Sequence, residues 1–104
     1  MGEKSYLRAL THADRVRVAF TTQKGKVLSF RVQYETFIQN RWHPVVRDDT
    51  AHNFAHIDII HPNKTTEKVP LYFLTYNAAL AYAQEDIKLN WEKYRKNYVE
   101  ELAK

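Results

Sequence analysis

Apolar and polar residues alternate through two neighbouring segments, residues 15–22 and 27–38. A period of two sends successive side chains to opposite faces of a β-strand, so both segments predict half-buried strands. Between them stands Gln23-Lys24-Gly25, and a three-residue stretch that ends in Gly is typical of a hairpin loop. Such a loop predicts three apolar pairs on one face: Phe20 opposite Leu28, Val18 opposite Phe30 and Val16 opposite Val32.

A second turn is predicted at residues 39–41, with Tyr34 opposite Val46 and Ile38 opposite Trp42 on the buried side. Pro44 cannot donate a hydrogen bond to a ladder, so this strand is expected to be bulged or to lie at an edge there. Further strands are expected at about residues 56–60 and 68–74.

The C-terminal segment changes to a helical period. Asn77 is the expected N-cap, and the helix is expected to reach about residue 102. At ~1.5 Å per residue it would be roughly 39 Å long, against a diameter of about 33 Å for a compact domain of this size. An overhanging end would present Tyr94 and Tyr98 to a dimer or partner, unless that end is frayed. The apolar stripe comprises Leu80, Ala83, Ile87, Trp91, Tyr94, Tyr98 and Leu102.

These patterns predict one α+β domain over residues 1–104. Its antiparallel meander sheet of four to five strands spans about residues 15–74, and a long C-terminal helix at about residues 77–102 packs on one face of the sheet.

Cysteine is absent from the 104 residues, which excludes a disulfide framework and thiolate metal or redox chemistry. The first residues contain no apolar run of the kind found in signal peptides or membrane spans. A cytoplasmic protein without membrane association is therefore the expectation.

The formal net charge of +4 is unevenly distributed along the chain. Residues 1–47 carry nine Lys or Arg and three acids, whereas residues 48–104 carry seven and nine. The predicted registers place Arg17 beside Arg31 on the face away from the helix, with Asp49 on the other side of Arg31. Arg15, Gln33 and Arg47 form the next row. A basic face of this kind can bind nucleic acid by neutralising phosphates, and Arg15, Arg17 and Arg31 are its candidate residues. The alternative is a solvated surface with charges paired inside the protein.

Residues 47–61 contain three of the five histidines and three carboxylates. If residues 56–60 form a strand, His56 and Asp58 project from the same face. His52 lies on the loop before the strand and could reach the same side. A pair of imidazoles can supply and accept protons near neutral pH, and an arginine can stabilise charge on a phosphate. The candidate catalytic set for metal-free phosphodiester cleavage is Arg47, Asp49, His52, His56 and Asp58.

Two alternatives to catalysis are open for this segment. The spacing of His52 and His56 suits a divalent metal on a helix, but the periodicity here is that of a strand. The histidines could also simply hydrogen-bond the loops and the sheet edge. Hydrolase triads and nucleotide-binding folds are poor candidates because no nucleophile motif or Gly-rich phosphate loop is present. No cofactor is expected.

One stretch carries a resemblance: Val45-Val46-Arg47-x-Asp49-Thr50-Ala51-His52-x-x-x-His56-x-Asp58-x-x-His61-Pro62. It resembles the centre of a family of short, functionally uncharacterised prokaryotic proteins. The flanks at residues 27–42 and 90–94 agree with that family. Two positions depart from its pattern: Asp48 stands where an aromatic is usual, and Asn53 stands where Gly is usual.

The order of Arg47, Asp49, His52 and His56 is also similar to that in the TumE-like toxin components of toxin–antitoxin systems. This resemblance implies a small, basic, ribonuclease-type protein directed at RNA. It also implies an antitoxin-like protein partner, while the C-terminal helix offers a homodimer as the alternative. The remaining functional alternatives are a non-catalytic module that binds protein or nucleic acid, and a divalent-metal-binding protein.

Overall fold

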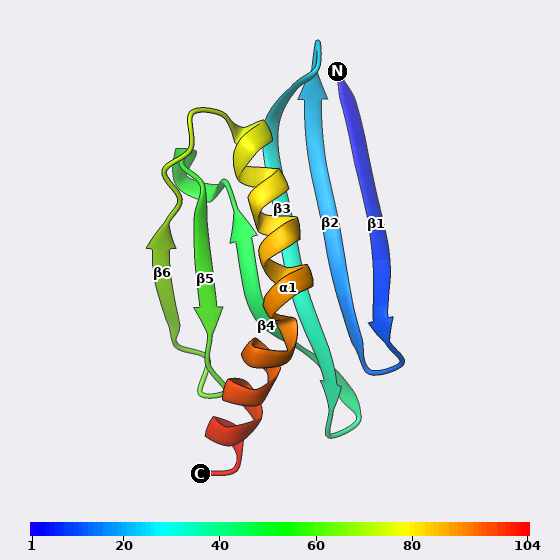
Figure 1. Cartoon of the computed structure of the whole chain (residues 1–104), viewed down its shortest axis with the longest axis vertical. Coiled ribbons are helices and arrows are strands. Elements are labelled where there is room, and N and C mark those ends of the chain that lie inside the picture. Colours follow the sequence, from blue (N-terminus) through cyan, green and yellow to red (C-terminus); the bar gives the residue numbers. More distant parts are fainter.

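The computed structural model describes the backbone of residues 1–104 and every side chain except that of His52. Six antiparallel strands form one sheet in chain order, and a single long helix lies across it (Figure 1). A 3-10 turn at Ala51–Asn53 precedes the fifth strand. The elements are β1 (Gly2–Thr11), β2 (Asp14–Gln23), β3 (Lys26–Ile38), β4 (Arg41–Asp49), β5 (His56–Ile60), β6 (Thr66–Pro70) and α1 (Tyr76–Leu102).

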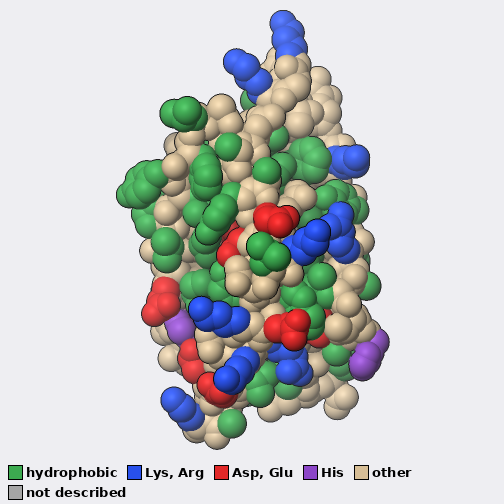
Figure 2. Space-filling model, in the orientation of Figure 1, with side chains coloured by type: hydrophobic (Ala, Val, Ile, Leu, Met, Phe, Trp, Pro, Cys, Tyr) green, Lys and Arg blue, Asp and Glu red, His purple; other side chains and the backbone are tan. Residues whose placement is uncertain are grey.

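The α+β meander is confirmed, but the expected number of strands is too low. The sheet begins at β1, before the expected start near residue 15. The sequence pattern did not reveal β1, because this edge strand is largely exposed on both faces and lacks an apolar–polar alternation. At the other edge, β6 ends at Pro70. Tyr72, Phe73 and Leu74, which the alternation assigned to a strand, are instead exposed in the loop before α1. Seen from the side of the helix, hydrophobic side chains are prominent in the upper half of the molecule (Figure 2).

The register predicted for β2 and β3 is wrong by two residues. Phe20 pairs with Phe30, Val18 with Val32 and Val16 with Tyr34. The hairpin has two residues rather than three, with φ of 52° at Lys24 and 79° at Gly25, as a type I′ turn requires. A bulge near Thr21 adds to the shift. Because a displacement of two residues preserves parity, Val16, Val18, Phe30 and Val32 still lie on their predicted face. Leu28, at the bulge, is instead 41% exposed, and Val27 packs against the core in its place.

The next hairpin agrees in part with its prediction. Tyr34 does pair with Val46, and the expected irregularity at Pro44 is present as a bulge. Beyond the bulge the register shifts, so Ile38 lies opposite Arg41 rather than Trp42. The turn again has two residues of positive φ, 54° at Gln39 and 64° at Asn40.

The helix begins slightly earlier than expected, because its N-cap is Thr75 rather than Asn77. The hydroxyl of Thr75 accepts a hydrogen bond from the amide of Ala78 at 3.1 Å. Asn77 instead joins α1 to the β2–β3 hairpin: its side chain accepts from the Val27 amide and donates to the Gly25 carbonyl. The start of the covering helix is thereby attached to the end of the sheet.

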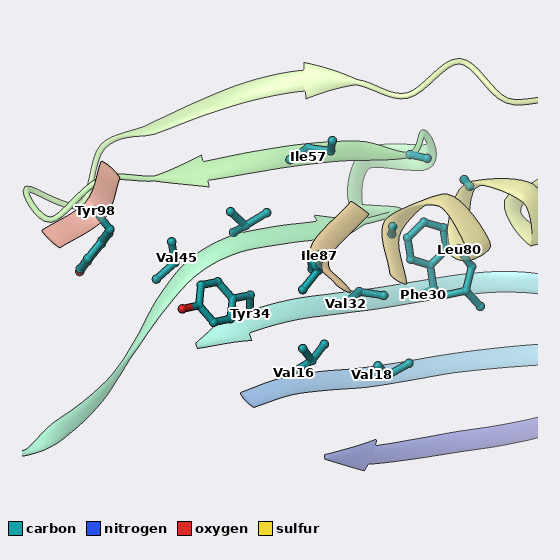
Figure 3. Close-up of a cluster of buried hydrophobic side chains, with 14 residues drawn as sticks. Val16, Val18, Phe30, Val32, Tyr34, Val45, Ile57, Leu80, Ile87 and Tyr98 are labelled. Atoms are coloured by element: carbon teal, nitrogen blue, oxygen red, sulfur yellow. The ribbon is translucent and has the colours of Figure 1, made fainter. Parts of the chain in front are cut away.

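Packing beneath α1 extends along its full length, mainly against β3 and then β4. Leu80 and Ile87 lie over Phe30, Val32 and Tyr34 (Figure 3). The expected overhang of exposed aromatic residues is absent from the described structure.

Both residues that were to form the overhang are engaged within the protein. Tyr98 is 6% exposed and contacts His43, while Tyr94 donates to Asp86 at 2.6 Å. The structural reason for expecting a dimer through this end of the helix therefore does not hold. The helix is also not long and apolar enough to cross a membrane.

Candidate nucleic-acid interface

The side of the sheet turned away from α1, here called the open face, carries two rows of polar residues. The first row follows directly from the strand pairing and crosses from β2 to β5 as Ala19, Arg31, Asp49 and His56. The second row crosses from β2 to β6 as Arg17, Gln33, Arg47, Asp58 and Lys68. Cross-strand neighbours lie about 4.5–5.5 Å apart at their Cβ atoms, so each row brings its side chains into contact.

Asp49 is the centre of the first row. Its Oδ1 lies 3.0 Å from Nε2 of His56, and its Oδ2 lies 3.3 Å from Nη2 of Arg31. The Ala51 amide also donates to Oδ1 at 3.2 Å. Asp49 is 4% exposed, and the Arg31 guanidinium and the Ala51 amide replace part of the water that its carboxylate loses on burial.

His56 is enclosed even more completely, with 1% of its surface exposed. Its Nδ1 lies 3.2 Å from the carbonyl oxygen of Phe54, which can only accept a hydrogen bond. Its Nε2 lies near Asp49, 3.2 Å from Nζ of Lys68 and 3.6 Å from Oδ2 of Asp58. Both ring nitrogens therefore already have partners inside the protein.

Arg47 and Asp58 occupy adjacent positions of the second row but make different contacts. Nε of Arg47 donates to Oε1 of Gln33 at 2.7 Å. Asp58 is 8% exposed, and its Oδ1 lies 3.4 Å from Nζ of Lys68. Arg47 is thus held by an amide, while Asp58 is held by an ammonium group.

The basic residues of β2 gather around a buried carboxylate, Glu35. Arg15 donates to it at 2.6 Å and Arg17 at 3.1 Å, and Gln33 also bonds to it. Burial raises the pKa of Glu35, but hydrogen bonds from Arg15, Gln33 and Arg17 outweigh this and lower its pKa overall. The guanidinium of Arg15 also lies 3.9 Å above the ring of Trp42.

The described side chains place most of the predicted candidates in two clusters. Asp49, His56 and Asp58 meet in one, with Arg31 beside them, while Arg15 and Arg17 meet at Glu35 in the other. Arg17 does not stand opposite Arg31 as predicted, because the shifted register puts Gln33 there. His52 lies outside the described side chains, so its predicted part in the site has no structural description.

Lys68 and Glu35 are contributors that the sequence interpretation missed. Lys68 reaches His56 and Asp58 because β6 pairs with β5, and that register has no local signal in the sequence. Glu35 could have been recognised, because its parity along β3 places it on the same face as Arg31 and Gln33.

A metal site does not fit this arrangement. Among the described side chains, no group of three or more His, Asp or Glu residues is arranged to hold an ion. The cationic groups of Arg31 and Lys68 lie against the oxygens of Asp49 and Asp58, where a metal would have to bind.

In the two clusters of the open face, the acidic side chains are buried and most of the cationic side chains are exposed. The side chains of Glu35, Asp49 and Asp58 are only 7%, 6% and 12% exposed. The cations that neutralise them extend outward: the side chains of Arg17, Arg31 and Lys68 are 52%, 56% and 43% exposed. Over these two clusters, a ligand approaching the face meets the cations before it meets the acids, whereas Glu3 of β1, paired with Thr21, is exposed.

Asp48 lies on the opposite side of the same strand, beneath the helix. It is 0% exposed, and neither carboxylate oxygen has a hydrogen-bond partner among the described residues. Burial, followed by the nearby charges of Asp86, Asp49 and Asp58, raises its pKa to about 8. Asp48 therefore belongs to the core and takes no part in the open face.

Comparisons with known proteins give a family but no characterised relative. No curated protein and no solved structure gives a significant match to the chain. A family model described as a domain of unknown function (DUF7718) matches residues 1–104, which is the whole chain. This agrees with the expectation of an uncharacterised family, and the protein belongs to the DUF7718 family.

Proposed function

We propose that the protein binds single-stranded RNA on its open face. The observation that carries this proposal is the arrangement of charge described above: buried carboxylates hold arginine and lysine side chains whose outer ends face solvent. Phosphates are bound by such cations, and the release of counterions drives the association. Restraining each guanidinium before binding also reduces the entropy that it loses on contact with RNA.

Exposed aromatic rings on the same face supply the second element of such a site. Phe54 and Phe37 are each 41% exposed. Phe54 packs against His56 with ring centroids 5.2 Å apart, and Phe37 packs against Trp42 at 5.3 Å. Unpaired bases stack on aromatic rings of this kind, at about 1–3 kcal/mol per base, whereas paired bases are inaccessible.

Ribonuclease-type activity is the second candidate. The Asp49–His56 contact of 3.0 Å favours it, since a carboxylate commonly orients a catalytic imidazole. Binding without cleavage fits the geometry better, because His56 is enclosed and both of its nitrogens are bonded within the protein. An imidazole must reach its ligand directly or through one water to transfer a proton.

The binding proposal is tested by fluorescence anisotropy with a short labelled single-stranded RNA. Replacing Arg17 and Arg31 together by Ala should weaken binding by roughly tenfold for each guanidinium removed. The dependence of log affinity on log salt should flatten by about 0.7 for each phosphate that the variant no longer neutralises.

The matched control is the double variant Arg8→Ala and Lys88→Ala, which removes two positive charges from the helix side. It should reduce affinity far less. Equal losses from both pairs would indicate non-specific attraction by net charge and would reject the open face as the binding site.

Cleavage is tested separately by incubating the wild-type protein with the same RNA and separating the products on a denaturing gel. Intact RNA would reject the ribonuclease candidate while leaving the binding proposal in place. If cleavage occurs, His56→Gln should abolish it while the variant remains folded, as judged by its circular dichroism spectrum. Continued cleavage by a folded His56→Gln protein would place the chemistry elsewhere.

A further inference from the structure

A shallow trough lies on the open face over β1, β2 and β3. It consists of two adjoining hollows of about 540 and 440 Å³ that share Ser5, Ala19 and Arg31. Sites for small ligands typically have volumes of about 300–1,000 Å³. The trough is therefore large enough for a group the size of one nucleotide.

Short side chains create this hollow. Ala19 is paired with Ser5 on one side and with Arg31 on the other. Next to them, the hydroxyl groups of Thr21 and Ser29 are hydrogen-bonded to each other at 2.8 Å. The floor thus offers methyl and hydroxyl groups at a level below the neighbouring long side chains.

Long polar side chains form the wall that faces the second row. Arg31 is fixed through Nη2 by Asp49, and Arg17 is fixed through Nε by Glu35. Gln33 lies between them in the lining and is held by Arg47 and Glu35. A guanidinium carries five N–H donors in a planar fork that matches a phosphate, so these anchored arginines retain donors for a ligand.

We propose that the trough holds one unpaired nucleotide of the bound RNA, with its base over Ala19 and its phosphate at Arg31 and Arg17. This inference rests on the proposed function and adds a defined subsite to it. The base would lie on the flat floor between Ser5 and Ser29, where hydroxyl groups can hydrogen-bond its edge. The adjacent arginines would meet the phosphate attached to the same nucleotide.

The shape of the trough makes the site selective for single strands. A base can enter it only when its edge and faces are free, whereas the bases of a duplex are stacked and paired. Duplex RNA would contact the arginines through its phosphates alone. Filling the trough should therefore lower the affinity for single-stranded RNA more than the affinity for duplex RNA.

The test is Ala19→Ile, which fills the trough with a β-branched side chain suited to a strand. Ala9→Ile is the matched control, because Ala9 is exposed on the same face, opposite Arg15, and outside the trough. Affinity of Ala19→Ile for single-stranded RNA should fall roughly tenfold, while affinity for a duplex of the same sequence should change by less than about twofold. Ala9→Ile should leave both affinities unchanged.

The outcomes separate the two proposals. If Ala19→Ile binds single strands as well as Ala9→Ile does, while Arg17→Ala with Arg31→Ala weakens binding, the nucleotide subsite is wrong and the RNA-binding face stands. If neither change affects binding, both proposals fail.

A second measurement requires no variant. Titrating the wild-type protein with the single-stranded RNA should shift the backbone amide resonances of Ser5, Ala19 and Ser29. Shifts confined to β4 and β5 would place the nucleotide outside the trough and overturn the inference, even if Ala19→Ile proved too unstable to study.

Discussion

Asp48 and Asp49 are neighbours in the chain, but the pleat of β4 sends them to opposite faces of the sheet. Asp49, on the open face, contacts Arg31, His56 and the Ala51 amide. Asp48, beneath α1, has no hydrogen-bond partner among the described residues. Both are nearly inaccessible, at 4% and 0% exposure.

The difference shows that burial alone does not decide what a carboxylate does to a fold. On the open face, the buried acids are paired with cations, and the outer ends of these cations remain exposed to solvent. Under the helix, Asp48 has no hydrogen-bond partner among the described residues and lies near the like charge of Asp86, so an ionised Asp48 would destabilise the folded state. The open face can therefore carry a binding function, whereas the covered face supplies stability and is sensitive to pH.

The largest expected effect concerns Asp48. Its pKa is about 8 in the folded protein and 3.8 in the unfolded chain. The folded state retains a proton that the unfolded state releases, so the contribution of Asp48 to stability should be greatest below about pH 4 and fall as pH rises to about 8. The decline should approach ~1.4 kcal/mol per pH unit, or roughly 6 kcal/mol in total.

Urea denaturation across this pH range measures the decline. Asp48→Asn should remove most of it, whereas Asp49→Asn should retain it. A wild-type free energy of unfolding that is constant over this range would show that Asp48 finds a partner or water in solution.

The next effect compares packing on the two faces. Leu80 is 7% exposed beneath α1, whereas Leu7 is 53% exposed on the open face of β1. Leu80→Ala should reduce the free energy of unfolding by about 2–5 kcal/mol because it leaves a cavity. Leu7→Ala should change it by less than about 0.5 kcal/mol. Similar losses for both, measured by denaturant titration, would mean that the open face is covered in solution.

A smaller effect is expected from the paired acid of the open face. Asp49→Asn removes the buried charge that lies beside Arg31 and His56, so it should destabilise the protein by about 1–3 kcal/mol. Arg31→Gln removes only the exposed partner and should cost no more than about 1 kcal/mol. Thermal melting compares the two variants. A larger loss for Arg31→Gln would contradict the central position of Asp49 in this cluster.

The smallest expected effect concerns Glu35, whose contribution to stability changes with pH in the direction opposite to that of Asp48. Hydrogen bonds lower the pKa of Glu35, so its contribution is present at neutral pH and is lost as pH falls through its folded-state pKa. Glu35→Gln should reduce stability by on the order of 1 kcal/mol at neutral pH and by less in acid. A deficit that stays constant as the pH is lowered would exclude this carboxylate as a source of the acid dependence.

The sequence resemblance led to an expectation of Gly at position 53 and of an aromatic residue at position 48. Asn53 has a φ of 68°, so the loop does adopt the conformation for which Gly is usual. Asp48 occupies a position that faces the core, where an aromatic residue would be accommodated without a charge.

Much of the candidate face could be predicted because alternation fixes parity. Arg31, Asp49, His56 and Asp58 lie on the predicted side of the sheet, since an error of two residues in register does not change faces. Which residues stand opposite one another was predicted less well. Both hairpins use two-residue turns with positive φ at Lys24 and Gln39, where these residue types give only a weak signal.

By itself, the sequence determined the strand periodicity, the single C-terminal helix and the face on which the charged residues lie, because these depend on the local period of side chains. Only the tertiary structure decided that β1 completes the sheet, that Lys68 reaches His56, and that Asp48 is left unpaired beneath α1 among the residues described. Those outcomes depend on pairing between distant segments and on what the helix covers, which no local pattern specifies.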